Sequence, residues 1–162
     1  MEVRVFDNLF TNEELDSFRT EAIELLKKTK DVSDDNLTHC ASIDRQDIVD
    51  KVKNFLENKF NIILNCHNIQ YQVWKVGSQS TLHVHDEYGR SICDYNTLIY
   101  LNDDFDGGEF YTLNEIIPVK KGNVTFFNGE KIWHGVKPVK TNDRYTIIIW
   151  WFNSNVPNNC SR

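Results

Sequence analysis

The sequence lacks the features of a membrane-spanning, exported or duplex-binding chain. No window approaches the roughly 20 consecutive apolar residues that a membrane span needs, and Met1-Glu2-Val3-Arg4 does not begin a signal peptide. Lys and Arg together number 18 against 24 Asp and Glu, and this net charge of −6 provides no cationic surface for duplex nucleic acid. We therefore expect a cytoplasmic protein that contacts neither membranes nor duplex nucleic acid.

Cysteine is also sparse, and several catalytic motifs are missing. The four cysteines, Cys40, Cys66, Cys93 and Cys160, lie far apart and form no C-x-x-C pair. Neither a thiolate zinc knuckle nor a dense disulfide framework is therefore expected, and we interpret the cysteines as reduced thiols. No serine lies in a G-x-S-x-G context and no P-loop is present, so hydrolase and NTPase functions lack support.

What is present is enough apolar and charged surface for one folded domain. The chain has 162 residues, of which 40% are hydrophobic and 26% charged. This length and composition predict a single domain over residues 1–162, with a helical support region (1–68) and a β-rich core (69–153). We expect a monomer or a weak dimer.

Two helices are predicted before residue 69. Thr11-x-x-Glu14 has the pattern of a capping box, and the apolar residues that follow recur at three- and four-residue steps. A second amphipathic helix fits residues 45–58, and the polar stretch 30–38 between the two helices is predicted to be a loop. We expect both helices to cover one face of a sheet.

From residue 69 onward the sequence predicts strands. Short runs rich in Val, Ile, Tyr, Trp and Thr alternate with clusters of Gly, Asn and Asp. We place strands near residues 69–76, 81–87, 95–101, 109–113, 124–127, 132–139 and 144–152. This many short strands after two helices favour a mainly β fold, a sandwich or jelly roll, over alternating βαβ units.

The densest group of candidate metal ligands lies in the second of these strands. Because side chains alternate across a strand, His83, His85 and Glu87 share one face. Two imidazoles and one carboxylate are typical of non-haem Fe(II), and His85 with Glu87 supplies one of each. His134, on a later strand, is the obvious third ligand.

Arg144 is the candidate anion-binding residue. It begins the most apolar strand of the chain, where a guanidinium is costly to bury unless it meets an anion. Thr146 lies on the same face and provides a hydroxyl two residues away. The pair suits a dicarboxylate cosubstrate, since a guanidinium can grip a carboxylate with two hydrogen bonds.

Together these residues resemble the Fe(II)- and 2-oxoglutarate-dependent dioxygenases of the prolyl hydroxylase type. The resemblance covers about residues 71–153, roughly half of the chain. It consists of segments in the order found in that family: Trp74-x-x-Gly77, the ligand pair, the stretch TLIYLNDDFDGGE at 97–109, Gly122, His134-Gly135-Val136-x-Pro138-Val139 and Arg144-Tyr145.

The resemblance implies a double-stranded β-helix, a cupin-like jelly roll with two helices packed on one sheet. It also implies Fe(II), 2-oxoglutarate and O₂ as metal, cosubstrate and oxidant, with ascorbate as a candidate auxiliary reductant. The implied site residues are the iron ligands His85, Glu87 and His134, the salt-bridge partner Arg144, the hydroxyl contact Tyr100, and the pocket residues Leu98 and Asn96.

Two features depart from the family's pattern. The family usually has H-x-D, and counting from Gly77 would place the first ligand at His83, with His85 where Asp is expected. We favour His85 with Glu87 because this choice keeps a carboxylate, and leave open a set of three histidines, His83, His85 and His134. In addition, Trp74 stands where relatives usually have Tyr.

The expected function is hydroxylation of an amino-acid side chain, with a peptidyl proline or a small amino acid as substrate and succinate and CO₂ as co-products. Two alternatives stay open. One is a jelly-roll binding module without catalysis, and the other is a cupin-type metal protein, since Gly77, His83 and His85 fit the opening of that signature.

Overall fold

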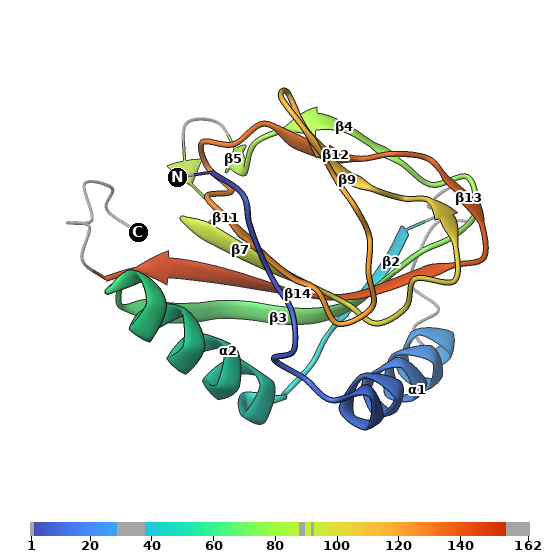
Figure 1. The fold of residues 1–162 in the computed structure, drawn as a ribbon, viewed down its shortest axis with the longest axis horizontal. Helices are drawn as coiled ribbons and strands as arrows, with labels where there is room; N and C mark the ends of the chain where they lie inside the picture. Colours follow the sequence, from blue (N-terminus) through green and yellow to red (C-terminus); the bar gives the residue numbers. More distant parts are fainter. Residues whose placement is uncertain (1, 29–37, 88–89, 92, 155–162) are drawn as a thin grey trace.

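The computed structural model describes residues 2–28, 38–87, 90–91 and 93–154, without the side chains of residues 87, 90 and 91. Two helices lie on the outer face of a large antiparallel sheet, and a smaller sheet faces its other side (Figure 1). The layers are therefore helix, large sheet and small sheet, with one interface on each side of the large sheet.

Helix α1 (Asn12–Lys28) begins at the predicted capping box. The Thr11 backbone N–H donates to Glu14 Oε2 at 2.8 Å, and the Glu14 N–H donates to Thr11 Oγ1 at 3.2 Å. These two bonds satisfy N–H groups that have no partner within the helix. The helix turns Leu15, Phe18 and other apolar residues inward, as their spacing predicts.

Helix α2 (Gln46–Phe60) matches the predicted helix to within two residues at each end. It ends at Asn61, which adopts a left-handed conformation (φ 51°) and donates its N–H to Glu57 O at 2.9 Å. Asn tolerates this conformation better than most residues, so it is a suitable C-terminal cap. No helix in the described part of the chain is long and apolar enough to cross a membrane.

The large sheet has six strands in the order β1-β11-β7-β14-β3-β2. Its strands are β1 (Arg4–Phe6), β2 (Thr38–Ser42), β3 (Leu64–Trp74), β7 (Tyr95–Tyr100), β11 (Val124–Phe127) and β14 (Arg144–Asn153). The long strand β14 pairs antiparallel with β3 on one side and with β7 on the other. It is therefore a central strand, hydrogen-bonded along both edges.

The small sheet has four strands in the order β10-β9-β12-β4. These are β4 (Ser80–His83), β9 (Phe110–Thr112), β10 (Ile116–Ile117) and β12 (His134–Val136). Two two-stranded ribbons complete the structure: β5 (Asp86–Glu87) with β6 (Arg90–Ser91), and β8 (Asp106–Gly107) with β13 (Val139–Thr141). The predicted mainly β fold with N-terminal helices is confirmed.

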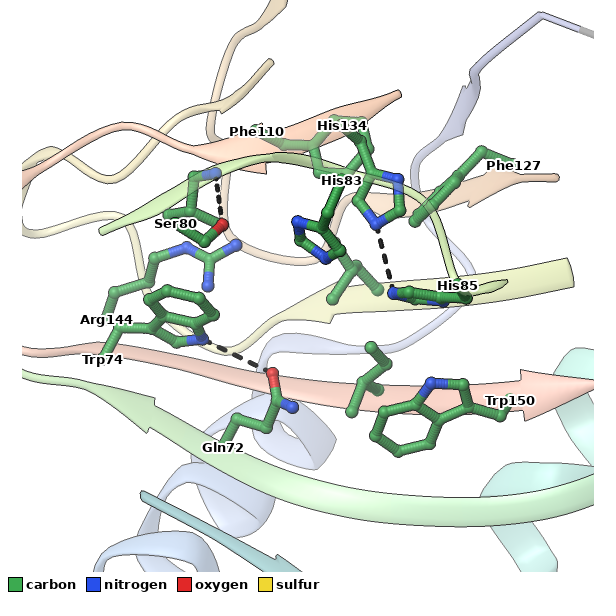
Figure 2. Close-up of a pocket in the computed structure, with 13 residues that line it drawn as sticks. Gln72, Trp74, Ser80, His83, His85, Phe110, Phe127, His134, Arg144 and Trp150 are labelled. Atoms are coloured by element: carbon green, nitrogen blue, oxygen red, sulfur yellow. Dashed lines mark hydrogen bonds between the residues drawn. The ribbon is translucent and has the colours of Figure 1, made fainter. Parts of the chain in front are cut away.

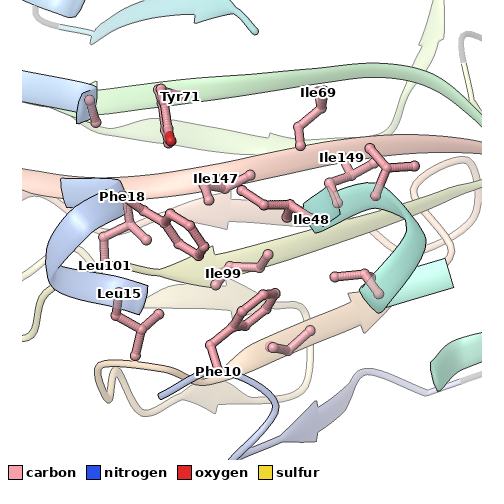
Figure 3. Close-up of a cluster of buried hydrophobic side chains, with 14 of the residues drawn as sticks. Phe10, Leu15, Phe18, Ile48, Ile69, Tyr71, Ile99, Leu101, Ile147 and Ile149 are labelled. Carbon is pink, nitrogen blue, oxygen red and sulfur yellow. The ribbon is translucent and has the colours of Figure 1, made fainter. Parts of the chain in front are cut away.

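The main core lies between the two helices and the large sheet (Figure 3). Ile147 and Ile149 of β14 project into it beside Ile99 of β7, and all three are fully buried. A second, smaller apolar cluster lies on the opposite face of the same strands and includes Leu98 and Ile148. Alternation along each strand thus divides the residues between two interfaces.

Some predicted element boundaries are wrong. Residues 38–42 form the edge strand β2, which pairs with β3, although the predicted loop 30–38 includes the first of them. Strand β3 begins at Leu64, five residues before the predicted start, because its polar first half pairs with the end of β14. The strand predicted over 81–87 ends at His83, and the chain turns before β5. The predicted loop 30–37 lies outside the described residues.

Truncation of the central strand should destabilise the fold. Ile149→Ala removes a fully buried side chain from the interface between β14 and the helices. We expect a loss of about 2–5 kcal/mol in the free energy of unfolding, measured by urea denaturation. Ile63→Ala, at a side chain that is 51% exposed, is the control and should cost about 0.5 kcal/mol or less. Equal losses would show that this interface does not carry the stability of the fold.

Candidate metal and cosubstrate site

Three histidines converge between the two sheets. His83, at the end of β4, His85, just beyond it, and His134, the first residue of β12, place one ring nitrogen each within 4.8 Å of one another. Their ring centroids are 4.5–5.5 Å apart. Figure 2 shows all three rings at the wall of one cavity. No other group of this kind occurs among the described side chains.

Strand pairing brings these distant residues together. β12 pairs antiparallel with β4, and the register sets His134 directly opposite His83. The chain then leaves β4, and the His85 N–H donates to the carbonyl of Gly129 at 2.8 Å. This bond holds His85 beside the other two rings although it no longer belongs to the strand. The alternation rule therefore does not place His85; the turn after β4 does.

Each imidazole is oriented from behind by an oxygen acceptor. His83 Nδ1 lies 2.9 Å from Thr81 O, and His134 Nδ1 lies 2.7 Å from Ile132 O. His85 Nδ1 lies 2.7 Å from Asn96 Oδ1. Because these oxygens can only accept, each Nδ1 carries the proton and each Nε2 keeps its lone pair. This is the tautomer that a metal ligand requires.

The Nε2 atoms of His85 and His134 lie 3.2 Å apart. With both protons on Nδ1, no hydrogen joins these two nitrogens, and their lone pairs face each other. When two nitrogens bind the same metal ion at about 2.0–2.1 Å and the two bonds are roughly perpendicular, the distance between the nitrogens is similar to the one observed here. The arrangement therefore fits a shared metal ion, which would relieve the repulsion between the lone pairs.

Burial keeps two of the imidazoles neutral. It lowers the pKa of His85 to about 4 and that of His134 to about 3, because the charged form loses its hydration. The neighbouring imidazoles lower these pKa values further. Neutral rings at physiological pH are ready to bind a metal without first releasing a proton.

Asn96, on β7, supports His85 together with two neighbours. Its Oδ1 accepts from His85 Nδ1 and also from the Cys93 thiol, at 3.2 Å. Burial raises the pKa of Cys93 to about 12, so the thiol keeps the proton that it donates. Gly129 closes this contact, because a Cβ there would come within 2.0 Å of Asn96 Oδ1 and 2.8 Å of His85 Nδ1. A side chain at residue 129 would displace the support of the ligand.

Arg144 lines the same cavity, on the side opposite His85 (Figure 2). Its side chain is fully buried, and its Nε and Nη1 atoms have no hydrogen-bond partner. Within the described part of the chain it forms no ion pair with a carboxylate. A buried guanidinium with unsatisfied N–H groups is costly, so the cavity is suited to an anion that accepts from Arg144.

Polar and aromatic groups surround the guanidinium. Arg144 Nη2 donates to Tyr100 Oη at 3.4 Å, and the guanidinium carbon lies 5.0 Å from the Tyr100 ring and 5.5 Å from the Trp74 ring. Trp74 Nε1 donates to Gln72 Oε1 at 3.4 Å, so its indole N–H takes part in the site. Thr146 Oγ1 is buried without a partner. The Tyr100 hydroxyl thus lies beside Arg144, whereas neither Tyr100 nor Thr146 is among the residues that line the cavity.

The cavity has a volume of about 130 Å³ and is walled mainly by apolar side chains. Its lining residues are Gln72, Trp74, Ser80, His83, His85, Leu98, Phe110, Phe127, His134, Val136, Arg144, Ile148 and Trp150. The predicted pocket residue Leu98 is among them, whereas Asn96 lies behind His85 and contacts its Nδ1. The structure therefore brings together His85, His134 and Arg144, as the sequence predicts.

His83 joins this group, as in the set of three histidines that the sequence left open. In the sequence, His83 was indicated by its distance from Gly77, which is the distance at which the family's pattern places the first ligand. The backbone of Glu87 lies in β5, but its side chain is outside the described part of the chain, so its role as a ligand stays a prediction. Gln72, which the sequence analysis did not single out, was detectable only as a residue on the same strand face as Trp74.

Comparison with known proteins agrees with this site. Residues 69–152, more than half of the chain, match the 2OG-Fe(II) oxygenase superfamily. The chain belongs to this superfamily. Prolyl 3-hydroxylase 2 of Mus musculus is 39% identical over 66 residues, which are 36% of this chain and 9% of that protein. Prolyl 3-hydroxylase 1 of Gallus gallus is 28% identical over 95 residues, 54% of this chain and 13% of that protein. The oxygenase thus spans about a tenth of the length of these curated relatives.

Solved structures extend the similarity of the fold to nearly the whole chain. A viral collagen prolyl hydroxylase from Paramecium Bursaria Chlorella virus-1 matches with a TM-score of 0.75 at 20% identity, covering 93% of this chain and 95% of that one. A Pseudomonas putida prolyl-4-hydroxylase matches with a TM-score of 0.78 at 12% identity, covering 93% and 91%. The expected double-stranded β-helix with two supporting helices is confirmed.

Removal of the acceptor behind His85 should weaken metal binding. We expect Asn96→Leu to lower the affinity for Co(II) or Fe(II) by about 10–100-fold, the usual effect of losing such a support, measured by calorimetry under anaerobic conditions. Asn96→Asp keeps an acceptor and should retain the affinity. Asn114→Ala, in an exposed turn, is the control. Unchanged affinity in Asn96→Leu would show that the hydrogen bond does not position His85.

The metal-free oxygenase should lose stability in acid. Between pH 6.5 and about 4, unfolded His85 and His134 bind protons that the folded imidazoles, with their lowered pKa values, do not bind. The free energy of unfolding should therefore be highest above pH 6.5 and fall by about 1 kcal/mol or more per pH unit below it. Urea denaturation from pH 7.5 to 4.5 measures the slope. His134→Asn should reduce this slope, whereas His67→Asn, at an exposed residue, should leave it unchanged. The reverse result would contradict the assignment of the slope to the buried histidines.

Proposed function

We propose that this chain is a dioxygenase that uses Fe(II), 2-oxoglutarate and O₂ to hydroxylate an amino-acid side chain of a peptide, with proline as the favoured target. Membership of the superfamily and the histidine cluster support the metal and the cosubstrate. The observation that carries the proposal is the buried, unpaired guanidinium of Arg144 in the cavity that the imidazoles line.

The metal ligands in this proposal are His83, His85 and His134. Three ring nitrogens within 4.8 Å of one another, each ring held by a hydrogen bond on its Nδ1 side, form a ligand set suited to a transition-metal ion. Burial of His134 and of the supporting Asn96 excludes water from the back of the site. This set differs from the expected His85, Glu87 and His134 in having an imidazole in place of the carboxylate.

Arg144 is proposed to bind the distal carboxylate of 2-oxoglutarate. Its Nε and Nη1 groups are donors without partners, and the Tyr100 hydroxyl, which accepts from Nη2 at 3.4 Å, offers its own hydrogen as a further donor. An anion here would satisfy groups that are otherwise buried without partners, and these charge-assisted bonds are stronger than neutral ones. A dicarboxylate can span from Arg144 toward the histidines because both line one cavity.

The protein's contribution is to bind, orient and exclude water. The chemistry supplied by the bound metal and cosubstrate is activation of O₂, coupled to decarboxylation of 2-oxoglutarate to succinate and CO₂. Leu98, Phe110 and Phe127 wall the cavity beside the histidines and keep it apolar. Because burial lowers the pKa values of His85 and His134, these two imidazoles would be ready to bind a metal at physiological pH without releasing a proton.

The choice of substrate rests on the relatives. The sequence relatives are prolyl 3-hydroxylases, and one structural neighbour, from Trichoplax adhaerens, is a prolyl hydroxylase in complex with a peptide fragment of a hypoxia inducible factor. Since fold alone does not transmit substrate identity, proline in a peptide is the first target to test and a small amino acid the second. The cytoplasm is the proposed location.

The defining experiment is an anaerobic titration of the Fe(II)-loaded protein with 2-oxoglutarate, followed by exposure to O₂ and a peptide containing proline. We expect a charge-transfer absorbance, then succinate, and a peptide heavier by one oxygen atom. The absence of both the absorbance and succinate would exclude the dioxygenase and would be compatible with a non-catalytic module. The same assay with free proline separates the two substrate classes.

Arg144→Met tests the cosubstrate site. We expect its affinity for 2-oxoglutarate to fall by at least about 30-fold, because losing one partner of a buried charge pair costs about 2–5 kcal/mol. Its metal content should stay near that of the wild type. Arg19→Met, which removes a surface guanidinium 3.2 Å from Asp104, is the matched control. If both variants bind 2-oxoglutarate equally well, the distal carboxylate lies elsewhere.

A further inference from the structure

Gln72 is a polar residue of the cavity that has no part in the proposed contacts to the metal or to 2-oxoglutarate. It lines the cavity from β3, on the same strand face as Trp74. Its Oε1 accepts a hydrogen bond from Trp74 Nε1 at 3.4 Å. Figure 2 shows this bond, with the carboxamide of Gln72 between the side chains of Trp74 and Trp150.

The bond to Trp74 fixes which way this carboxamide faces. Because an indole N–H can only donate, the atom of Gln72 that it meets must be the oxygen. The Nε2 group then lies on the side of Trp150 (Figure 2), and within the described part of the chain its N–H groups have no hydrogen-bond partner. The tyrosine that relatives usually have at residue 74 could donate or accept, so it would not set this direction. Trp74 therefore makes Gln72 a donor for a ligand that reaches it.

Gln72 lies at the rim of the cavity floor. Strand pairing places it between Cys40 of β2 and Thr146 of β14, and residues paired in this way share one face of the sheet. Cys40 is exposed, Gln72 is partly buried and Thr146 is fully buried, so exposure falls from β2 toward β14. Arg144, proposed to hold the cosubstrate, belongs to the buried side. A ligand that enters from the β2 side after the cosubstrate therefore meets Gln72.

We propose that Gln72 is a residue that determines substrate specificity, and that its Nε2 donates to a backbone carbonyl of the peptide at the residue to be hydroxylated. This inference rests on the proposed function, since it takes the substrate to be a peptide. A carbonyl that leaves water at the rim needs a donor, because an unpaired buried carbonyl is costly. A proline has a backbone carbonyl but no N–H, so a donor is the group that its backbone can use. Gln72, oriented as a donor by Trp74, supplies it.

The test compares two substitutions that remove the donor in different ways. Gln72→Glu keeps an oxygen for Trp74 Nε1 and loses only the N–H groups, whereas Gln72→Met loses both. The readout is the affinity for a proline-containing peptide, measured by calorimetry on the Co(II)-loaded protein saturated with 2-oxoglutarate. We expect both variants to bind the peptide about tenfold more weakly than the wild type, because a hydrogen bond is lost and the carbonyl stays unpaired. The affinity of Gln72→Met for 2-oxoglutarate should stay near that of the wild type.

Gln70→Glu is the matched control. It makes the same change on the same face of β3, at a residue outside the cavity lining, and should bind the peptide like the wild type. An equal loss in Gln70→Glu would overturn the proposal. Weaker peptide binding in Gln72→Met alone would also overturn it, because Gln72 would then only support Trp74. So would weaker binding of 2-oxoglutarate with an unchanged affinity for the peptide.

Calorimetry with 2-oxoglutarate alone keeps this inference separate from the proposed function. A wild-type protein that binds 2-oxoglutarate but not the peptide would refute the role of Gln72 and leave the cosubstrate site intact. A wild-type protein that does not bind 2-oxoglutarate would refute the proposed function itself.

Discussion

The alternation of side chains along β14 is the constraint on which the rest of the structure depends. Its odd-numbered residues, Ile147, Ile149 and Trp151, pack into the core beneath the helices. Its even-numbered residues face the other way, and Arg144, Ile148 and Trp150 line the cavity. Because β14 is hydrogen-bonded along both edges, a slip of one residue would move the guanidinium into the core and break both interfaces.

The small sheet brings the metal ligands to that strand. Pairing of β12 with β4 sets His134 opposite His83, and the turn after β4 returns His85 to the same place. Backbone carbonyls behind two of the rings and the Asn96 amide behind the third fix the tautomers. The supports come from β4 of the small sheet, from Ile132 just before β12 and from β7 of the large sheet, so the two sheets must be packed together before the site exists.

The cavity is characterised by the charged and metal-ligating groups that line it. Among the described side chains, a buried guanidinium and three imidazoles, two of them with lowered pKa values, line this cavity without any Asp or Glu. Relatives in the superfamily are identified over the strands that carry these groups.

The sequence by itself determined the faces of the elements and the kinds of chemistry. Periodicity places Leu15 and Phe18 on one face of α1, alternation places Arg144 opposite Ile147, and the capping box begins α1 where it should. These are local properties, and they depend on neighbours a few residues away. The edge strand β2 was missed because pairing with β3 gives it an extended conformation that its own composition does not indicate.

Only the tertiary structure decided which histidines meet. Alternation places His83, His85 and Glu87 on one face if the strand continues, but β4 ends at His83 and the next residues follow a turn. The position of His85 then depends on Gly129 and Asn96, residues far away in the sequence. Spacing along a chain cannot reveal such contacts, because they arise when separate strands pack around one cavity.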